Sequence, residues 1–361
     1  MFLLQHLNRI LQRLYSQPAS EASDLPEYVA PPPTTENLEW ADLAIIDFSQ
    51  ANTPAGRQEL AKQICQAMKT HGFFYIVNHG YTTEKTKRIF SIANATFDLV
   101  GAEEKRQLAG QSEEVYEGYK PRRTWQIEQG VADQIEHYNS ELELARICVQ
   151  LMNLLYQVNR SVRKREHPTV LKPHLDEIQA FAEHNHNHIL FNILRIMAIG
   201  MDLPEETFVE KHRFEAPGES SDIGSITILW SQPISGLQIL SPDGIWRYIR
   251  HIENALVVNT GDVMKLLSGG FYKPTIHRVV QPPIDQAKLE RLGVFYFAMA
   301  ADDIKLASVG GGGDNETVAP TMGDWRKQRT GKYGKGTMKQ SQTDGQVEEE
   351  VILGVTVKEY N

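Results

Sequence analysis

Three residues in the second half of the chain, Asp222, His277 and Arg291, have the chemistry to bind a metal ion and a carboxylate. Carboxylate oxygen and imidazole nitrogen are suitable ligands for non-haem Fe(II), which usually takes two histidines and one carboxylate on one face. An arginine holds a carboxylate through two parallel hydrogen bonds and keeps its charge. Each residue also has an ordinary explanation, as a turn aspartate, a core or surface histidine and a salt-bridge arginine.

Short strands must position these residues, because residues 224–300 alternate apolar runs with Gly, Pro, Asp and Asn turns. Several short strands at close spacing are typical of a β-sandwich or a jelly roll. His277 then lies on one strand, and Asp222 lies just before another. The predicted strands are Ser225–Trp230, Leu237–Leu240, Trp246–Ile249, Ala255–Asn259, Thr275–Val279 and Gly293–Ala298.

The rest of the chain has a mixed pattern of helices and strands. Residues 43–47 resemble a strand, as does the aromatic and β-branched run between the turns of residues 71–80, whereas residues 55–70, 82–100 and most of 140–212 have helical patterns. The part after Leu306 is Gly-rich and then polar, which favours a surface helix and a flexible end. We predict an extended arm at residues 1–40, an α/β region with helices at 41–215, a jelly roll at 216–305 and a C-terminal tail at 306–361.

Composition restricts the class of protein. The chain has 361 residues, of which 41% are hydrophobic and 23% are charged, so it can bury a sizeable core. A net charge of −9 argues against a nucleic-acid partner, and no apolar run is long enough for a membrane span. Cys65 and Cys148 have no CxxC neighbour, which favours a reducing compartment. We therefore expect a cytoplasmic protein that acts on a small molecule, of undetermined oligomeric state.

The first 18 residues have two interpretations. Apolar residues recur at helical spacing, Arg9 and Arg13 are present, and no acidic residue occurs before Glu21. This pattern is typical of a mitochondrial targeting helix. A surface helix, or a wrongly assigned start of the chain, explains the same pattern.

Several motifs, in their order and spacing, resemble the Fe(II)- and 2-oxoglutarate-dependent dioxygenases of the isopenicillin N synthase-like family, particularly members common in fungal metabolite pathways. The resemblance covers roughly residues 40–300. The motifs that carry it are Ile45-Ile46-Asp47, His71-Gly72-Phe73-Phe74-Tyr75, Asn78-His79-Gly80, Gly236-Leu237-Gln238-Ile239, Gly244-Ile245-Trp246, the run from Ala255 to Asp262, Gly269-Gly270-Phe271-Tyr272-Lys273, His277-Arg278-Val279-Val280, Gln281-Pro282-Pro283 and the run from Arg291 to Phe297.

The resemblance implies an α+β fold with a double-stranded β-helix (jelly-roll) core and flanking helices. It implies Fe(II) as cofactor and 2-oxoglutarate as cosubstrate, with Asp222 and His277 as iron ligands and Arg291 on the distal carboxylate of 2-oxoglutarate. Asp262 is implied to be structural. The implied activity is hydroxylation, desaturation or cyclisation of a small organic molecule, in specialised-metabolite biosynthesis.

The chain departs from the family pattern at three points. The family's His-x-Asp motif has serine here, at Ser220, and the third ligand would have to be another residue such as Glu219 or His212. About one strand–loop–strand unit is missing before residue 222, which should leave unpaired sheet edges and an incomplete core. The family's Arg-x-Ser ends in Gly293, so a hydroxyl that helps hold 2-oxoglutarate is absent.

Residues 140–157 interrupt an otherwise continuous family pattern and carry a helical apolar stripe. They are interpretable as an added helix for a partner or lid, as an extension of a helix, or as a translated intron paired with a skipped exon near codon 221. Three functions remain open after these departures: an oxygenase, an iron-less, catalytically inactive binding protein on the same fold, and a metal-free isomerase or cyclase.

Overall fold

The computed structural model describes most of the chain outside its N-terminus and several internal segments. The predicted helix at residues 1–18, the insertion at 140–157 and the residues Glu219, Ser220 and Asp222 lie outside the described part. The described residues are 25–109, 118–124, 126–128, 131–139, 167–213, 224–310, 318–332, 339–340 and 347–360.

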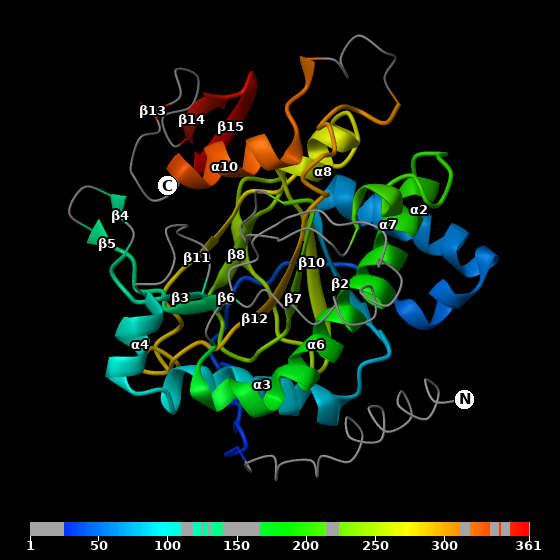
Figure 1. Cartoon of the computed structure of the whole chain (residues 1–361). Helices are drawn as coiled ribbons and strands as arrows, with labels where there is room; N and C mark the ends of the chain where they lie inside the picture. The colour runs from blue at the N-terminus through cyan, green and yellow to red at the C-terminus, as the bar shows by residue number, and fades with distance from the viewer. Residues whose placement is uncertain are drawn as a thin grey trace, which may run out of the picture.

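A five-stranded sheet with the order β1–β2–β10–β7–β12 forms the centre of the molecule (Figure 1). β1 runs parallel to β2, and the other neighbouring pairs are antiparallel. Strands from the N-terminal region and from the predicted jelly roll therefore share one sheet. The five strands are β1 (Ile45–Asp47), β2 (Phe73–Val77), β10 (Leu256–Thr260), β7 (Ile226–Trp230) and β12 (Val294–Ala298).

The two faces of this sheet bury different cores, because successive side chains of a strand point to opposite faces. Val258 on β10 joins a large core shared with the helices, whereas the adjacent Val257 joins a smaller core shared with a second sheet. Ile228 and Leu229 on β7 divide in the same way. All five residues of β7 are buried, since both of its faces are covered.

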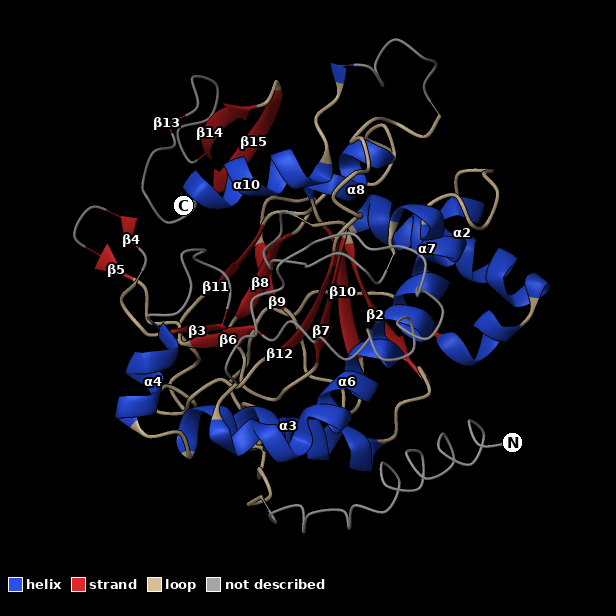
Figure 2. Ribbon diagram, in the orientation of Figure 1, coloured by secondary structure: helices blue, strands red, loops and turns tan. Residues whose placement is uncertain are grey.

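Helices cover one face of the five-stranded sheet (Figure 2). Thr53 caps α2 by accepting a hydrogen bond from the Gly56 N–H at 3.0 Å, and Pro54 occupies the first turn. Leu60 and Ile64 then face the core. The helical elements before residue 212 are η1 (Phe48–Asn52), α2 (Pro54–Thr70), α3 (Thr83–Asp98), α4 (Ala102–Ala109), η2 (Thr169–His174), α6 (Leu175–Glu183), the π-helix η3 (His184–Leu190), α7 (Phe191–Ile199) and η4 (Val209–Lys211).

A three-stranded sheet with the order β11–β8–β9 packs against the other face, so that the two sheets form a jelly-roll arrangement. Leu237 and Ile239 of β8 contact the core that contains Val257. We call the space between the two sheets the barrel interior. The strands are β8 (Leu237–Leu240), β9 (Trp246–Tyr248) and β11 (His277–Val279), and α8 (Asp262–Leu267) follows β10.

The barrel is open on one side within the described part of the chain. β11 and β12 are the outer strands of their sheets. Val279 pairs with Leu237 and Phe295 pairs with Leu229, so both face the barrel interior. Nevertheless Val279 is 60% exposed and Phe295 is 40% exposed. The prediction that the core is incomplete near residue 221 concerns residues outside the described part, so it stays a prediction.

The remaining elements lie around the barrel. The described part of the N-terminal arm is extended, and Thr34 and Thr35 tie it to Asp285. No helix in the described residues is long and apolar enough to cross a membrane. The small strands are β3 (Gly118–Lys120) paired with β6 (His137–Asn139), and β4 (Gln126–Glu128) paired with β5 (Val131–Ala132).

The C-terminal tail is more ordered than the sequence indicated. Its helix α10 (Met322–Lys332) is not simply a surface helix, because Met322 and Trp325 are fully buried in the helix-side core. A three-stranded antiparallel sheet follows in place of a flexible end. Its strands are β13 (Lys339–Gln340), β14 (Val347–Ile352) and β15 (Val355–Tyr360).

Candidate active site

His277 lies at the start of β11, on the barrel-facing side of the strand. It pairs directly with the buried Ile239 of β8. Its Nδ1 atom lies 2.8 Å from the carbonyl oxygen of Thr275. A carbonyl only accepts, so Nδ1 carries the proton, and in the neutral ring Nε2 keeps the lone pair for a metal. Metal-binding histidines are commonly held in this way, with the second nitrogen donating to a backbone carbonyl.

The N-terminal region fixes the position of this imidazole. The Phe73 ring packs edge-on against His277, with 5.3 Å between ring centroids. Gly72 has a φ of +67°, and a Cβ atom there would lie 1.6 Å from Thr275 Oγ1. Only glycine allows this approach between the start of β2 and the segment that holds His277. The Gly72-Phe73 pair therefore positions the candidate ligand, a role that sequence reasoning did not assign to it.

Arg291 lies just before β12 and beside the beginning of β8. Its Cδ atom would be 3.7 Å from a Cβ atom on Gly236, and the Val279 side chain is next to the same point. The Nε atom is buried and has no hydrogen-bond partner. Burial lowers the pKa of Arg291 to about 10. An unpaired buried donor is costly, so this guanidinium is suited to an anion that enters the barrel.

The structure places both His277 and Arg291 in the barrel interior, and their roles as metal ligand and carboxylate contact stay predictions. His277 pairs with Ile239 and Arg291 lies beside Gly236, three residues of extended chain earlier. Three residues of a strand span about 10 Å. This separation suits a short dicarboxylate held by the arginine at one end and by a metal beside the imidazole at the other.

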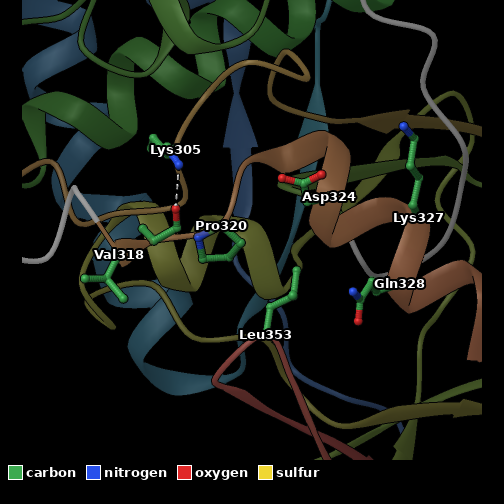
Figure 3. A pocket seen from close by; sticks show the side chains of 8 residues that line it. Lys305, Val318, Pro320, Asp324, Lys327, Gln328 and Leu353 are labelled. Carbon is green, nitrogen blue, oxygen red and sulfur yellow. Dashed lines mark hydrogen bonds between the residues drawn. The ribbon is translucent and has the colours of Figure 1, made fainter.

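A small cavity lies next to Arg291, between the ends of β7 and β8 and the start of β10. Its volume is about 20 Å³, which is enough for one water molecule. Polar side chains of Ser231, Gln232 and His251 line it together with the apolar Leu229 and Val257. A much larger surface cavity of about 550 Å³ beside α10 shares no lining residue with it (Figure 3).

The described residues of the site are better suited to bind 2-oxoglutarate than to bind Fe(II). In the described part of the chain, no three His, Cys, Asp or Glu side chains are grouped so as to hold a metal ion. Asp222 and Glu219 lie outside that part, and position 220 is a serine. The described residues therefore provide one imidazole of an Fe(II) site and do not complete the usual set of two histidines and one carboxylate.

His212, considered as a replacement ligand, is a structural residue instead. It is fully buried, its Nδ1 donates to the Phe208 carbonyl at 2.7 Å, and its Nε2 accepts from Ser225 Oγ at 2.7 Å. Both nitrogens are thus engaged, and desolvation lowers its pKa to about 4. Asp262 begins α8 directly after Gly261, and its structural assignment stays a prediction.

Gly293 stands where the family has a serine, and a neighbouring side chain fills the space beside it. A Cβ atom at this position would lie 2.5 Å from Cε2 of the Phe295 ring. The ring therefore occupies the space into which a serine side chain would project. A hydroxyl that contacts the Arg291-bound anion has to come from another segment.

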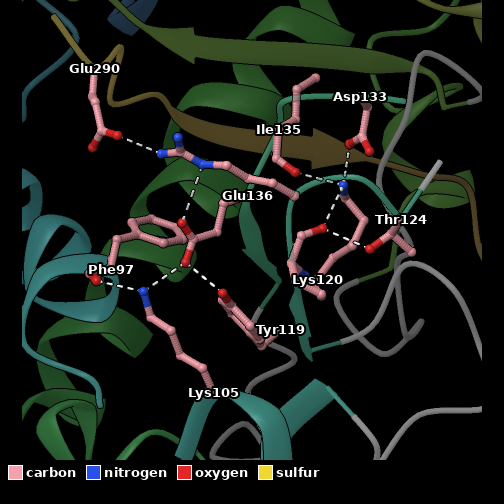
Figure 4. Close-up of polar contacts among 11 residues, drawn as sticks. Phe97, Lys105, Tyr119, Lys120, Thr124, Asp133, Ile135, Glu136 and Glu290 are labelled. Carbon is pink, nitrogen blue, oxygen red and sulfur yellow. Dashed lines mark hydrogen bonds and ion pairs between the residues drawn. The ribbon is translucent and has the colours of Figure 1, made fainter. Parts of the chain in front are cut away.

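A polar network connects the segment before Arg291 to the N-terminal region (Figure 4). Arg122 pairs with Glu290 at 2.6 Å, and Glu136 accepts hydrogen bonds from Lys105 at 2.8 Å and Tyr119 at 2.6 Å. Beside it, the buried Lys120 pairs with Asp133. These contacts join the β3–β6 pair to the residue immediately before Arg291.

Comparisons with known proteins identify the family of this chain. The N-terminal domain of non-haem dioxygenases, described from morphine synthesis, matches residues 43–152, and the 2OG-Fe(II) oxygenase superfamily matches residues 206–299. The 2-oxoglutarate-dependent dioxygenase frbH of Dothideomycetidae sp. is 25% identical over 342 residues, covering 86% of this chain and 96% of frbH. The fission-yeast UPF0676 protein C1494.01 is 25% identical over 79% of this chain and 90% of its own length.

A solved structure shows the same fold. A full-length Neurospora crassa protein in complex with alpha-KG (2-oxoglutarate) superimposes with a TM-score of 0.63 and 21% identity, covering 84% of this chain and all of the Neurospora chain. The two family matches fall on the strands that build the barrel and on the region that packs against it. Together with the arrangement of His277 and Arg291, they show that the chain belongs to the family of Fe(II)- and 2-oxoglutarate-dependent oxygenases.

Proposed function

We propose that this chain carries out 2-oxoglutarate-dependent oxidation of a small organic molecule in specialised metabolism, by hydroxylation, desaturation or cyclisation. Asp222 and His277 are the proposed iron ligands, and Arg291 is the proposed contact for the distal carboxylate of 2-oxoglutarate. Relatives with such roles support the proposal: frbH is a 2-oxoglutarate-dependent dioxygenase, and an Arabidopsis thaliana relative, 27% identical over 68% of this chain, is a scopoletin 8-hydroxylase.

The single observation that carries the proposal is the unpaired Nε atom of Arg291 inside the barrel. A buried guanidinium without a partner costs stability, and a carboxylate satisfies it through two parallel hydrogen bonds. The barrel-facing His277 lies about 10 Å away, estimated from three residues of strand. The family's metal supplies the oxidising chemistry, and the side chains of this site bind and orient the molecules.

A second candidate function is an iron-less binding protein on the same fold. Two observations favour it: Ser220 occupies the position of a family iron ligand, and within the described residues Val279 of β11 and Phe295 of β12 are exposed. A serine hydroxyl is a poor Fe(II) ligand compared with a neutral imidazole. In this alternative, Arg291 still binds a carboxylate, and no oxidation follows.

Two measurements on the purified full-length chain separate these functions. The first is an anaerobic Fe(II) titration in the presence of 2-oxoglutarate. The second is succinate release under air, with Arg291→Gln as the negative control. Iron binding with Arg291-dependent succinate release supports the oxygenase. Binding of 2-oxoglutarate without iron or succinate supports the binding protein, and sequencing the transcript around codon 221 then shows whether a His-x-Asp segment was omitted.

We further propose that the protein works in the cytoplasm and has neither nucleic-acid nor membrane partners. The basis is the net charge of −9 and the two cysteines without a paired motif. The substrate class is a small molecule, as a family neighbour illustrates: another solved structure of the Neurospora crassa protein, 22% identical to this chain, contains thymine. Subcellular fractionation of cells that express a tagged chain tests the location.

A further inference from the structure

A serine and a histidine line the cavity beside Arg291 and contact each other. Ser231 Oγ lies 2.8 Å from Nδ1 of His251 and also accepts the backbone N–H of Ile252 at 3.2 Å. On the other side of the ring, His251 Nε2 lies 3.4 Å from a carboxylate oxygen of Glu253. Ser231, His251 and Arg291 all line the one cavity.

These contacts determine where the hydroxyl proton points. Burial lowers the pKa of His251, with Glu253 opposing the shift, so the ring is neutral at neutral pH. A carboxylate only accepts, so Nε2 carries the proton and Nδ1 is an acceptor. Ser231 therefore donates its proton to Nδ1 while its oxygen accepts from Ile252. The hydroxyl is held in a defined orientation at the cavity wall and is able to rotate towards a stronger acceptor.

A carboxylate on Arg291 needs a further donor. Gly293 provides no hydroxyl, and the Phe295 ring fills the space beside it. Gln232 is not available, because both ends of its amide bond to the backbone of Ile234. Ser231, in contrast, donates to the side chain of His251. Its hydroxyl can rotate and donate the same proton to a bound carboxylate instead.

We propose that Ser231, oriented by His251, is the second hydrogen-bond donor to the carboxylate that Arg291 holds. In this chain the pair replaces the hydroxyl that is absent at position 293. The inference rests on the proposed function only for the identity of the ligand, which is the distal carboxylate of 2-oxoglutarate. His251 is a positioning residue, and Ser231 is a ligand-binding residue.

The test is calorimetric titration of the metal-free full-length chain with 2-oxoglutarate and with glutarate, which lacks the keto group. A hydrogen bond to a charged group contributes enough for Ser231→Ala to weaken both Kd values by about tenfold. Ser231→Thr keeps the hydroxyl and should bind within about twofold of the natural chain. His251→Ala should weaken binding by about threefold, since Ser231 remains but is no longer oriented.

Two controls keep the outcome interpretable. Ser241→Ala removes a buried hydroxyl at the far end of β8, outside the cavity, and should leave both Kd values unchanged. Ser235→Ala removes the other hydroxyl of the cavity lining. Thermal unfolding of each variant verifies that it is folded.

The outcomes separate this inference from the proposed function. If the natural chain binds neither diacid, the proposed cosubstrate site and this inference both fail. If binding depends on Arg291 but Ser231→Ala binds normally, or if Ser235→Ala is the variant that weakens binding, the cosubstrate site stands and the assignment of Ser231 is wrong. Tenfold weaker binding with Ser231→Ala and recovery with Ser231→Thr support the assignment.

Discussion

The two faces of the five-stranded sheet differ in how completely they are covered. On the helix-covered face, Val258 is fully buried and Trp230 donates to Asn185 at 3.1 Å. On the barrel-facing side, Val279 and Phe295 are exposed and the Nε atom of Arg291 has no partner. The face that supports the fold is thus well covered, whereas, among the residues that the structure describes, the face that would carry the chemistry has exposed apolar side chains and one imidazole of the proposed iron site. This contrast explains how the chain retains the family fold although its metal site departs from the family pattern.

Buried histidines make the helix-covered face sensitive to acid. Desolvation lowers the pKa values of His186 and His212 to about 4, from an ordinary value near 6.5. Both rings are neutral in the folded protein, and the unfolded chain gains protons below pH 6.5. Their contribution to stability is therefore complete above pH 6.5 and lost as the pH falls towards 4, by roughly 3 kcal/mol each as an upper bound.

Denaturant unfolding between pH 7 and pH 4 measures this loss. A free energy of unfolding that is constant between pH 7 and pH 4.5 would show that these histidines are not held neutral by burial.

A substitution of Arg291 separates an effect on ligand binding from an effect on the stability of the protein. Arg291→Met removes a buried donor without a partner, so the free energy of unfolding of the ligand-free chain should rise or stay unchanged. The same variant should weaken 2-oxoglutarate binding by about a hundredfold, because a bidentate charged contact is lost. Unfolding with and without 2-oxoglutarate measures both effects. A large loss of stability without ligand would mean that Arg291 is a structural residue.

A pair of identical substitutions compares the two faces directly. Val258→Ala on β10 should cost about 2 kcal/mol, because it removes two buried methyl groups and leaves a cavity. Val279→Ala on β11 should cost less than about 0.5 kcal/mol, since that side chain is already 60% exposed. Equal losses in denaturant unfolding would mean that another segment covers β11 and that the barrel is closed.

The smallest effect on the free energy of unfolding is expected for a substitution at the exposed edge of the polar network. Arg122→Gln removes the ion pair with Glu290, whose side chains are 48% and 75% exposed. Exposed pairs contribute less than about 1 kcal/mol, so stability should hardly change. A loss above about 2 kcal/mol in the same unfolding assay would show that this contact holds the Arg291 segment in place.

Much of the barrel was predictable because its strands have local signals. The alternation of apolar runs and turns located β7, β8, β9, β10, β11 and β12 within two residues of their observed bounds. The roles of His277 and Arg291 were assigned from the family resemblance of the motifs that contain them, and these roles remain predictions. The predicted assignment of Asp222 remains a prediction, since that residue lies outside the described part of the chain.

Features that depend on contacts between distant segments were not predictable. Phe73 and His277 meet only after the N-terminal strand joins the barrel, and Gly72 permits the approach. The burial of Trp325 needs the helix-side core to be assembled first. The sequence around His212 does not distinguish a metal ligand from a core residue. Its hydrogen bonds to Phe208 and Ser225 in the folded chain make that distinction.

The most direct test of the account is the Fe(II) affinity of the natural chain and of Ser220→His, measured anaerobically with 2-oxoglutarate present. Ser220→His restores the family's His-x-Asp spacing before Asp222, and Ser221→His, with the wrong spacing, is the matched control. The account predicts that Ser220→His binds Fe(II) at least about tenfold more tightly, since even partners outside the ligand set have effects of that size. Unchanged affinity, or an equal gain with Ser221→His, would contradict the claim that His277 and Asp222 belong to an iron site that lacks one ligand at position 220.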